Sequence, residues 1–269
     1  MKIILYYQTF TDITPILVNN SPVTHIHVAA THFGTDDQCN PYIHLNNYSP
    51  YNEKFDKMWY DMEQASKLGI EVKLMIGGAG GAFTTMFSDY NVYYSLLKTL
   101  LKSKSFISGV DLDVEETTDI NNIKKLIVDL KTDFENNFSI CLAPIQYSLQ
   151  SDVPGMGGFS YKELVYSPVG KYINYLNGQF YDDYTEQAYI DVINNNYNSS
   201  CIVMGMDGTE NLEERLSDIH NIYLKYGDNF GGVFLWEYCN GDPKWAEKVK
   251  NVLKKTFFEK YCSSIFKLN

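Results

Sequence analysis

Three carboxyl side chains alternate with branched apolar residues in the segment SGVDLDVEE, residues 108–116. Asp111, Asp113 and Glu115 occupy every second position, and valine or leucine fills the positions next to them. Side chains of a β-strand alternate between its two faces, so the three acids share one face, successive members roughly 6.6–7 Å apart. Such carboxyl groups cannot all ionise cheaply when partly buried, so at least one pKa should rise. A carboxylic acid that stays protonated near neutral pH can act as a general acid.

A solvated acidic edge, a calcium-binding loop and a site for another divalent metal are the other interpretations of this segment. The alternating apolar residues disfavour a solvated acidic edge, which would not need them. A calcium-binding EF-hand loop needs glycine at its sixth position, where this chain has Glu116. A Mg²⁺ or Mn²⁺ site built from several strand ends remains an alternative, because Asp182, Asp207 and Glu237 end other predicted strands.

Short apolar segments that predict strands recur along the chain, at residues 2–8, 24–30, 72–78, 109–115, 139–145, 173–181, 201–207 and 232–238. Amphipathic helical patterns lie between them, at residues 53–68, 119–136 and 211–226. Eight strands alternating with helices over about 250 residues predict a single (β/α)8 TIM barrel, which we assign to residues 1–269 as one domain. An open doubly wound sheet is the alternative, disfavoured because no glycine-rich phosphate loop follows the first strand. In a barrel the acids point inward and Glu115 lies at the C-terminal mouth, where active sites form.

The composition excludes several partners. A formal net charge of −11 repels nucleic acids and anionic membranes, so we expect neither as a partner. The apolar runs are too short to span a bilayer. No secretory signal precedes the first predicted strand, which favours a cytoplasmic protein, with secretion after removal of a leader as the alternative. His25 and His27 share a strand face without a third ligand, so we expect no metal and no cofactor.

The acidic segment resembles the signature of the family 18 glycoside hydrolases, the chitinases and endo-β-N-acetylglucosaminidases, usually written D-G-x-D-x-D-x-E on the fourth strand of a (β/α)8 barrel. Further segments match in order: HVAATHFG, VKLMIGGAGG, SICLAPIQ, NGQFYDD and GGVFLWEY. The resemblance covers nearly the whole chain. It implies an N-acetylglucosamine oligosaccharide or polysaccharide as substrate.

The resemblance also assigns catalytic roles. Glu115 would protonate the glycosidic oxygen, while the 2-acetamido oxygen of the substrate attacks the anomeric carbon with net retention. Asp113 would orient the acetamide N–H, and Tyr181 would donate a hydrogen bond to the acetamide carbonyl. Asp111 would share a proton or hydrogen bond with Asp113.

The substrate contacts follow from the same motifs. Trp236 would form the floor beneath the sugar at the cleaved bond. Gln179, Tyr147, Asp182 and Glu237 are weaker candidates for sugar contacts, since polar residues at strand ends are often only part of the barrel mouth.

One position departs from the signature: Ser108 stands where its first aspartate is expected. We expect Ser108 to remove a carboxylate behind Asp111 and to alter the pKa values around Asp113. The gap between the last two predicted strands, residues 208–229, holds one helix, which predicts a shallow groove and endo-type cleavage.

The leading interpretation is therefore a monomeric chitinase. An endo-β-N-acetylglucosaminidase acting on N-glycans and a non-catalytic chitin-binding lectin remain alternatives.

Overall fold

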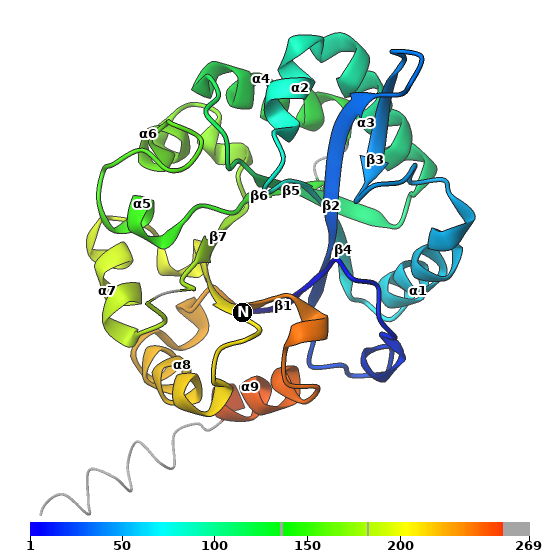
Figure 1. Ribbon diagram of the computed structural model, residues 1–269. Helices are drawn as coiled ribbons and strands as arrows, with labels where there is room; N and C mark the ends of the chain where they lie inside the picture. Colours follow the sequence, from blue (N-terminus) through cyan, green and yellow to red (C-terminus); the bar gives the residue numbers. More distant parts are fainter. Residues whose placement is uncertain (135–136, 182, 255–269) are drawn as a thin grey trace, which may run out of the picture.

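Eight parallel strands close into a barrel in the computed structural model, which describes residues 1–134, 137–181 and 183–254 (Figure 1). The barrel strands are β1 (Lys2–Tyr7), β2 (His25–Thr35), β4 (Glu71–Gly77), β5 (Ile107–Asp113), β6 (Ser139–Leu142), β7 (Tyr175–Gln179), β8 (Ile202–Asp207) and β9 (Gly232–Trp236). A ninth strand of the described residues, β3 (Pro41–Leu45), pairs with β2 in antiparallel register. Because β1 pairs in parallel with both β2 and β9, the sheet has no free edge within the barrel. This closure confirms the predicted (β/α)8 barrel and excludes the doubly wound sheet.

Helices surround the barrel on its outer side (Figure 1). They are α1 (Asp56–Lys67), α2 (Ala82–Ser88), α3 (Tyr90–Ser103), α4 (Ile120–Asp133), α5 (Gln146–Gln150), α6 (Tyr161–Tyr166), α7 (Glu186–Asn194), α8 (Leu212–Tyr226) and α9 (Trp245–Lys254). Short 3-10 turns are η1 (Thr14–Ile16), η2 (Glu53–Phe55), η3 (Gly170–Tyr172), η4 (Ser199–Cys201), η5 (Gly227–Asn229) and η6 (Tyr238–Asn240). The α4 and α8 helices begin where capping residues precede them, since the side chains of Asp119 and Asn211 accept hydrogen bonds from backbone amides of the first turn.

The predicted strand positions are confirmed, with one strand missed. Each predicted segment overlaps a strand of the barrel, but β2 runs on to Thr35 and pairs in antiparallel register with β3. This β2–β3 hairpin extends beyond the barrel wall (Figure 1). No helix in the described part of the chain is long and apolar enough to cross a membrane.

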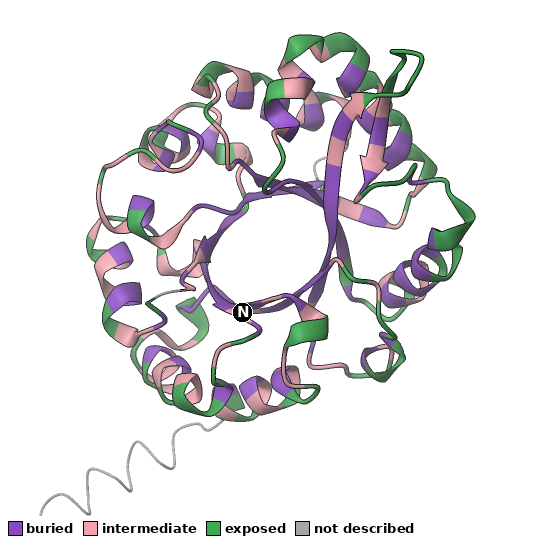
Figure 2. Cartoon of the chain, viewed as in Figure 1, coloured by how far each residue is buried: buried purple, intermediate pink, exposed green. Residues whose placement is uncertain are grey.

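The two faces of β5 meet different surroundings. Val110, Leu112 and Val114 belong to the core layer between the strands and the helices. Figure 2 shows the strands of the barrel as almost continuously buried. Burying each such side chain contributes roughly 1.5–3 kcal/mol. The apolar positions therefore fix β5 in the barrel, and the acidic positions are left to face the barrel interior.

Candidate active site

The three acids of β5 lie at increasing exposure from the barrel interior to its mouth. Asp111 is completely buried and Asp113 is 5% exposed. The strand ends at Asp113, so Glu115 lies just beyond it and is half-buried. The sequence predicted Glu115 within the strand at the C-terminal mouth of the barrel, whereas Glu115 follows the end of β5.

Asp111 is held by neutral hydrogen-bond donors from three other strands. Its Oδ2 atom accepts hydrogen bonds from the Tyr6 hydroxyl, from His27 Nδ1 at 2.9 Å and from Asn177 Nδ2 at 3.3 Å. Burial alone would raise the pKa of Asp111, but the interactions with His27 and Tyr6 outweigh it and lower that pKa. Asp111 is therefore held as a carboxylate inside the barrel.

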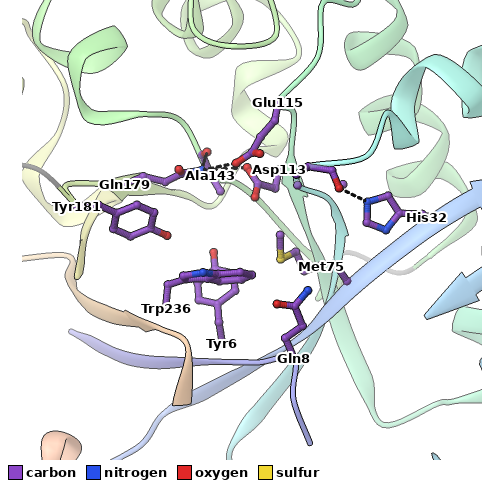
Figure 3. A pocket seen from close by; sticks show the side chains of 14 residues that line it. Tyr6, Gln8, His32, Met75, Asp113, Glu115, Ala143, Gln179, Tyr181 and Trp236 are labelled. Atoms are coloured by element: carbon purple, nitrogen blue, oxygen red, sulfur yellow. Dashed lines mark hydrogen bonds between the residues drawn. The ribbon is translucent and has the colours of Figure 1, made fainter. Parts of the chain in front are cut away.

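Asp113 and Glu115 share a hydrogen-bonding partner, Gln179 at the end of β7. Gln179 Nε2 lies 3.1 Å from Asp113 Oδ1 and 3.5 Å from Glu115 Oε1, and it also donates to the carbonyl oxygen of Ala143 at 2.9 Å. These contacts are the dashed lines around Gln179 in Figure 3. One amide group thus connects the two carboxyl groups across the cavity wall.

Both of these carboxyl groups hold their protons more tightly than usual. Burial and the nearby charges of Glu115 and Asp111 raise the pKa of Asp113 well above its ordinary value. Burial likewise raises the pKa of Glu115, against the opposing effect of the Gln179 hydrogen bond. The expectation that at least one pKa of the acidic group rises is confirmed for two of the three.

Glu116 has a structural place next to these acids. Its Oε1 atom accepts hydrogen bonds from the backbone amides of Phe83 at 2.5 Å and Thr84 at 3.2 Å, in the first turn of α2. Its negative charge also raises the pKa values of Asp113 and Glu115. Glu116 therefore anchors α2 beside the site.

A cavity of about 340 Å³ opens above Asp113 and Glu115 (Figure 3). It is lined by Tyr6, Gln8, Ala30, His32, Met75, Gly77, Gly78, Ala79, Asp113, Glu115, Ala143, Gln179, Tyr181 and Trp236. The indole of Trp236 lies across one side of it, seen edge-on in Figure 3, and the Tyr181 hydroxyl points into the space. Burial raises the pKa of Tyr181 well above its ordinary value, so this hydroxyl keeps its proton. The cavity thus combines a flat apolar surface, a hydroxyl donor and two proton-holding acids.

Two glycines let the backbone of β4 approach the acids. A Cβ atom on Gly77 would lie 2.1 Å from the carbonyl oxygen of Asp113, and Gly77 has a φ of +100°. The Gly78 amide donates to the same carbonyl oxygen at 2.8 Å. The absence of a side chain at Gly77 therefore allows the backbones of β4 and β5 to meet beside Asp113.

Three of the weaker sugar-contact candidates lie elsewhere or outside the described residues. Tyr147, on α5, is 62% exposed and does not line the cavity. Glu237 is buried, with Oε2 accepting the backbone amides of Gln8 at 2.8 Å and Thr9 at 2.9 Å, so it anchors the segment after β1 and is not part of the cavity wall. Asp182 lies outside the described residues.

The described residues do not form the alternative metal site at the strand ends. The Asp207 carboxylate accepts hydrogen bonds from the amide and hydroxyl of Thr209, and Glu237 is engaged as described above. The group of potential ligands found in the described part of the chain lies deeper in the barrel and consists of His27, Asp111 and Cys141. Burial raises the pKa of the Cys141 thiol well above its ordinary value, which opposes the thiolate form that binds metals.

The sequence interpretation missed the residues that hold Asp111. Tyr6, His27 and Asn177 face the barrel interior from β1, β2 and β7. The alternation of side chains could have found them, because Asn177 lies two residues before Gln179 on the same strand face. Gln8, His32 and Met75 were also missed as lining residues.

Ser108 does not lie among the carboxyl groups. It occupies the irregularity where β5 shifts its register against β4, and its hydroxyl donates to the carbonyl oxygen of Val72 at 3.1 Å. This contact gives no support for charge tuning by Ser108, which stays a prediction. The interior partners of Asp111 are Tyr6, His27 and Asn177.

Solved structures resemble the chain over almost its full length. A fungal endo-β-N-acetylglucosaminidase from glycosyl hydrolase family 18 matches with a TM-score of 0.84 and 26% identity, over 96% of this chain and 99% of that one. The chitinase ChiC from Aspergillus fumigatus matches with a TM-score of 0.80 and 26% identity, over 98% of both chains. A GH18 chitinase from Pseudoalteromonas aurantia shares the fold, with a TM-score of 0.71 and 19% identity over 94% of this chain and all of that one. Searches of protein-family models and of curated protein sequences find no match.

Proposed function

We propose that this chain, a family 18 glycoside hydrolase, cleaves β-1,4 bonds between N-acetylglucosamine units by a retaining, substrate-assisted route. The observation that carries the proposal is the pair Asp113 and Glu115. Both have a raised pKa, both line one cavity with Trp236, and Gln179 bonds to both. A carboxyl group that stays protonated beside a flat aromatic surface suits acid catalysis on a sugar.

Glu115 is the proposed general acid. It lies closest to the mouth, where a glycosidic oxygen can reach it, and its raised pKa keeps a proton available at higher pH than an exposed glutamate would. As the bond between the anomeric carbon and the leaving oxygen breaks, Glu115 gives that oxygen its proton. Water then attacks the anomeric carbon from the face that the leaving oxygen occupied, the bond between that carbon and the acetamide oxygen breaks, and Glu115 takes a proton from the water.

The acetamide group of the substrate is the proposed nucleophile. Its carbonyl oxygen forms a bond to the anomeric carbon while the glycosidic bond breaks, which gives a cyclic oxazolinium ion. Asp113 accepts a hydrogen bond from the acetamide N–H and stabilises the positive charge that develops there. The Tyr181 hydroxyl donates to the acetamide oxygen and positions it for attack.

Asp111, which is buried deeper in the barrel than Asp113, is the proposed acceptor of a hydrogen bond from Asp113. Its Oδ1 atom is buried and has no hydrogen-bond partner, whereas Oδ2 accepts three hydrogen bonds. Oδ1 is thus left to accept a hydrogen bond from Asp113 while Asp113 is protonated, between rounds of catalysis.

Cleavage within N-glycans is the second candidate activity. The two solved structures that share 26% identity with the chain are an endo-β-N-acetylglucosaminidase and a chitinase. The proposed chemistry is the same in both cases, since each bond cleaved follows an N-acetylglucosamine unit. A non-catalytic lectin is less well supported, because a lectin has no use for Glu115 as an acid.

A substrate panel separates these activities. Wild-type protein is incubated with fluorogenic chitotrioside, with the cellotrioside that carries hydroxyl groups in place of the acetamides, and with a high-mannose glycopeptide. The proposal expects release from chitotrioside and none from cellotrioside, with no effect of EDTA. Cleavage of the glycopeptide alone would establish the second candidate. Equal rates on chitotrioside and cellotrioside would contradict a role for the acetamide, and no cleavage of any substrate would contradict the hydrolase proposal.

A further inference from the structure

His27 lies completely buried beneath the proposed catalytic pair and is bonded at both ring nitrogens. Its Nδ1 atom is 2.9 Å from Asp111 Oδ2, and its Nε2 atom is 3.3 Å from the hydroxyl of Tyr175. The Tyr6 ring packs edge-on against the imidazole, with 4.9 Å between ring centroids. The imidazole is therefore fixed in orientation by two other strands and by Tyr6.

The partners of His27 determine which nitrogen carries the proton. Burial lowers the pKa of His27, so the ring is neutral and has one N–H group. Burial raises the pKa of Tyr175 well above its ordinary value, so the tyrosine hydroxyl is a donor. Nε2 then accepts from Tyr175, and Nδ1–H donates to the carboxylate of Asp111.

The ionisable groups facing His27 come from the surrounding strands: Tyr6 on β1, His25 on β2, Glu71 and Lys73 on β4, Asp111 on β5, Cys141 on β6 and Tyr175 on β7. Lys73 is completely buried and is paired with Glu71 at 2.9 Å. Burial lowers the pKa of His25 to about 4, so it is neutral at working pH. The charge that His27 chiefly meets is that of Asp111.

We propose that His27 is a positioning residue that holds Asp111 as a carboxylate, through its Nδ1–H group, and leaves Oδ1 free for the proton of Asp113. This inference rests on the proposed function, because it concerns the proton exchange between Asp111 and Asp113. The Tyr6 hydroxyl, His27 and Asn177 all donate to Oδ2, and the His27 contact, at 2.9 Å, is shorter than that of Asn177, at 3.3 Å. Tyr175 holds the other ring nitrogen of His27. Without the His27 donor the buried carboxylate loses part of its stabilisation and takes up a proton at higher pH.

Two amide variants separate this role from a structural one. In His27→Asn the side-chain NH₂ reaches about the place of Nδ1 and still donates to Asp111, whereas in His27→Gln it reaches about the place of Nε2. We expect His27→Asn to keep the wild-type pH profile of kcat/KM. His27→Gln should move the acid limb upward by about one pH unit and lower kcat about tenfold, with little change in KM. His25→Asn, on the same strand face but paired with Glu71, is the matched control and should leave both limbs in place.

The direction of the shift follows from the form of Asp111 that the reaction needs. The carboxylate of Asp111 must be ionised to accept the hydrogen bond of Asp113, so activity is lost as pH falls through its pKa. Loss of the Nδ1–H donor raises that pKa, and the acid limb moves to higher pH. Identical acid limbs in His27→Asn and His27→Gln would overturn the proposal, whether both match the wild type or both shift.

A second measurement tests His27 without using turnover. With ¹³C-carboxyl-labelled aspartate, the Asp111 signal is assigned by its loss in Asp111→Asn, and its titration is followed in the folded wild type and in both variants. The proposal expects a higher midpoint in His27→Gln than in wild type or His27→Asn, and equal midpoints would overturn it. A wild type that cleaves no substrate but shows this difference would refute the proposed function and leave the role of His27 toward Asp111 standing.

Discussion

At the scale of single residues, Gln179 bonds to both of the proposed catalytic acids, Asp113 and Glu115, and affects the pKa of each. Its amide hydrogen bonds favour the ionised forms of Asp113 and Glu115, against the burial that raises both pKa values. The pKa values of the two acids therefore depend on two opposing effects, burial, which raises them, and the Gln179 hydrogen bonds, which lower them. Changing one of them should move the pH profile in a known direction.

Removal of this amide should extend activity to higher pH. In Gln179→Ala the pKa values of Asp113 and Glu115 rise further, so Glu115 stays protonated longer as pH rises. We expect the alkaline limb of kcat/KM to move upward by about one pH unit, measured from pH–rate profiles with fluorogenic chitotrioside. Gln8→Ala is the control, since Gln8 lines the same cavity but its recorded hydrogen bonds are made by its backbone, and it should leave the limbs in place whatever its effect on KM. An unchanged limb in Gln179→Ala would show that the amide does not set these pKa values.

The same scale shows what could be predicted about the site and what could not. Asp113, Glu115, Gln179, Tyr181 and Trp236 stand at or just after strand ends within motifs that resemble a known family, and the structure places them around one cavity. Tyr6 lies outside these motifs, and His27 begins the segment HVAATHFG but received no catalytic role from the resemblance. The roles of both residues depend on which strands become neighbours across the barrel. Tyr147 and Glu237 were predicted as sugar contacts but do not line the cavity. Tyr147 is exposed on the surface, and Glu237 accepts hydrogen bonds from backbone amides.

At the scale of elements, the contact between the ends of β4 and β5 fixes the position of the Asp113 backbone at the mouth of the barrel. The Gly77 backbone approaches the Asp113 carbonyl more closely than any side chain would allow, and the Gly78 amide bonds to that carbonyl. The periodicity of the sequence predicted these strands well because each has an apolar face. The β3 strand was missed because it only extends β2 into a hairpin beyond the barrel, where its pattern of buried residues is short.

A methyl group at Gly77 should separate these strand ends. We expect Gly77→Ala to lower the free energy of unfolding by at least about 2 kcal/mol, because the φ of +100° and the contact with the Asp113 carbonyl both exclude a Cβ atom. Urea denaturation followed by circular dichroism measures this. Gly69→Ala is the control: Gly69 also has a positive φ, of +82°, but nothing within 4 Å of its Cβ position, so it should cost less. Equal losses of unfolding free energy in Gly77→Ala and Gly69→Ala would show that the contact of Gly77 with β5 does not contribute to stability.

At the scale of the whole molecule, the buried acids stabilise the fold unequally. The pKa of Asp113 is raised in the folded state, so the folded protein holds that proton more tightly than the unfolded chain does. Stability therefore falls as pH rises from the ordinary pKa of aspartate toward the raised value. For Asp111 the pKa is lowered, so its contribution is present above the ordinary pKa and is lost as pH falls.

Two substitutions should consequently shift stability in opposite directions. At pH 7 we expect Asp113→Asn to raise the free energy of unfolding by about 0.5–2 kcal/mol while activity is lost, and the gain should shrink toward acidic pH. Asp111→Asn should lower stability at pH 7, because it replaces the carboxylate to which three donors bind. Thermal unfolding from pH 4 to 8 measures both. A loss of stability in Asp113→Asn at neutral pH would contradict a raised pKa at that position.

Glu115 is proposed to supply the proton that breaks the glycosidic bond. The most direct measurement compares kcat on fluorogenic chitotrioside for the wild type, Glu115→Gln and Glu116→Gln. Glutamine at position 116 can still accept the amides of Phe83 and Thr84, so this neighbouring variant controls for the loss of one carboxyl group. We expect Glu115→Gln to lose about 100- to 10,000-fold in kcat while still binding the sugar, and Glu116→Gln to keep most of the wild-type rate. Wild-type turnover by Glu115→Gln would contradict the account.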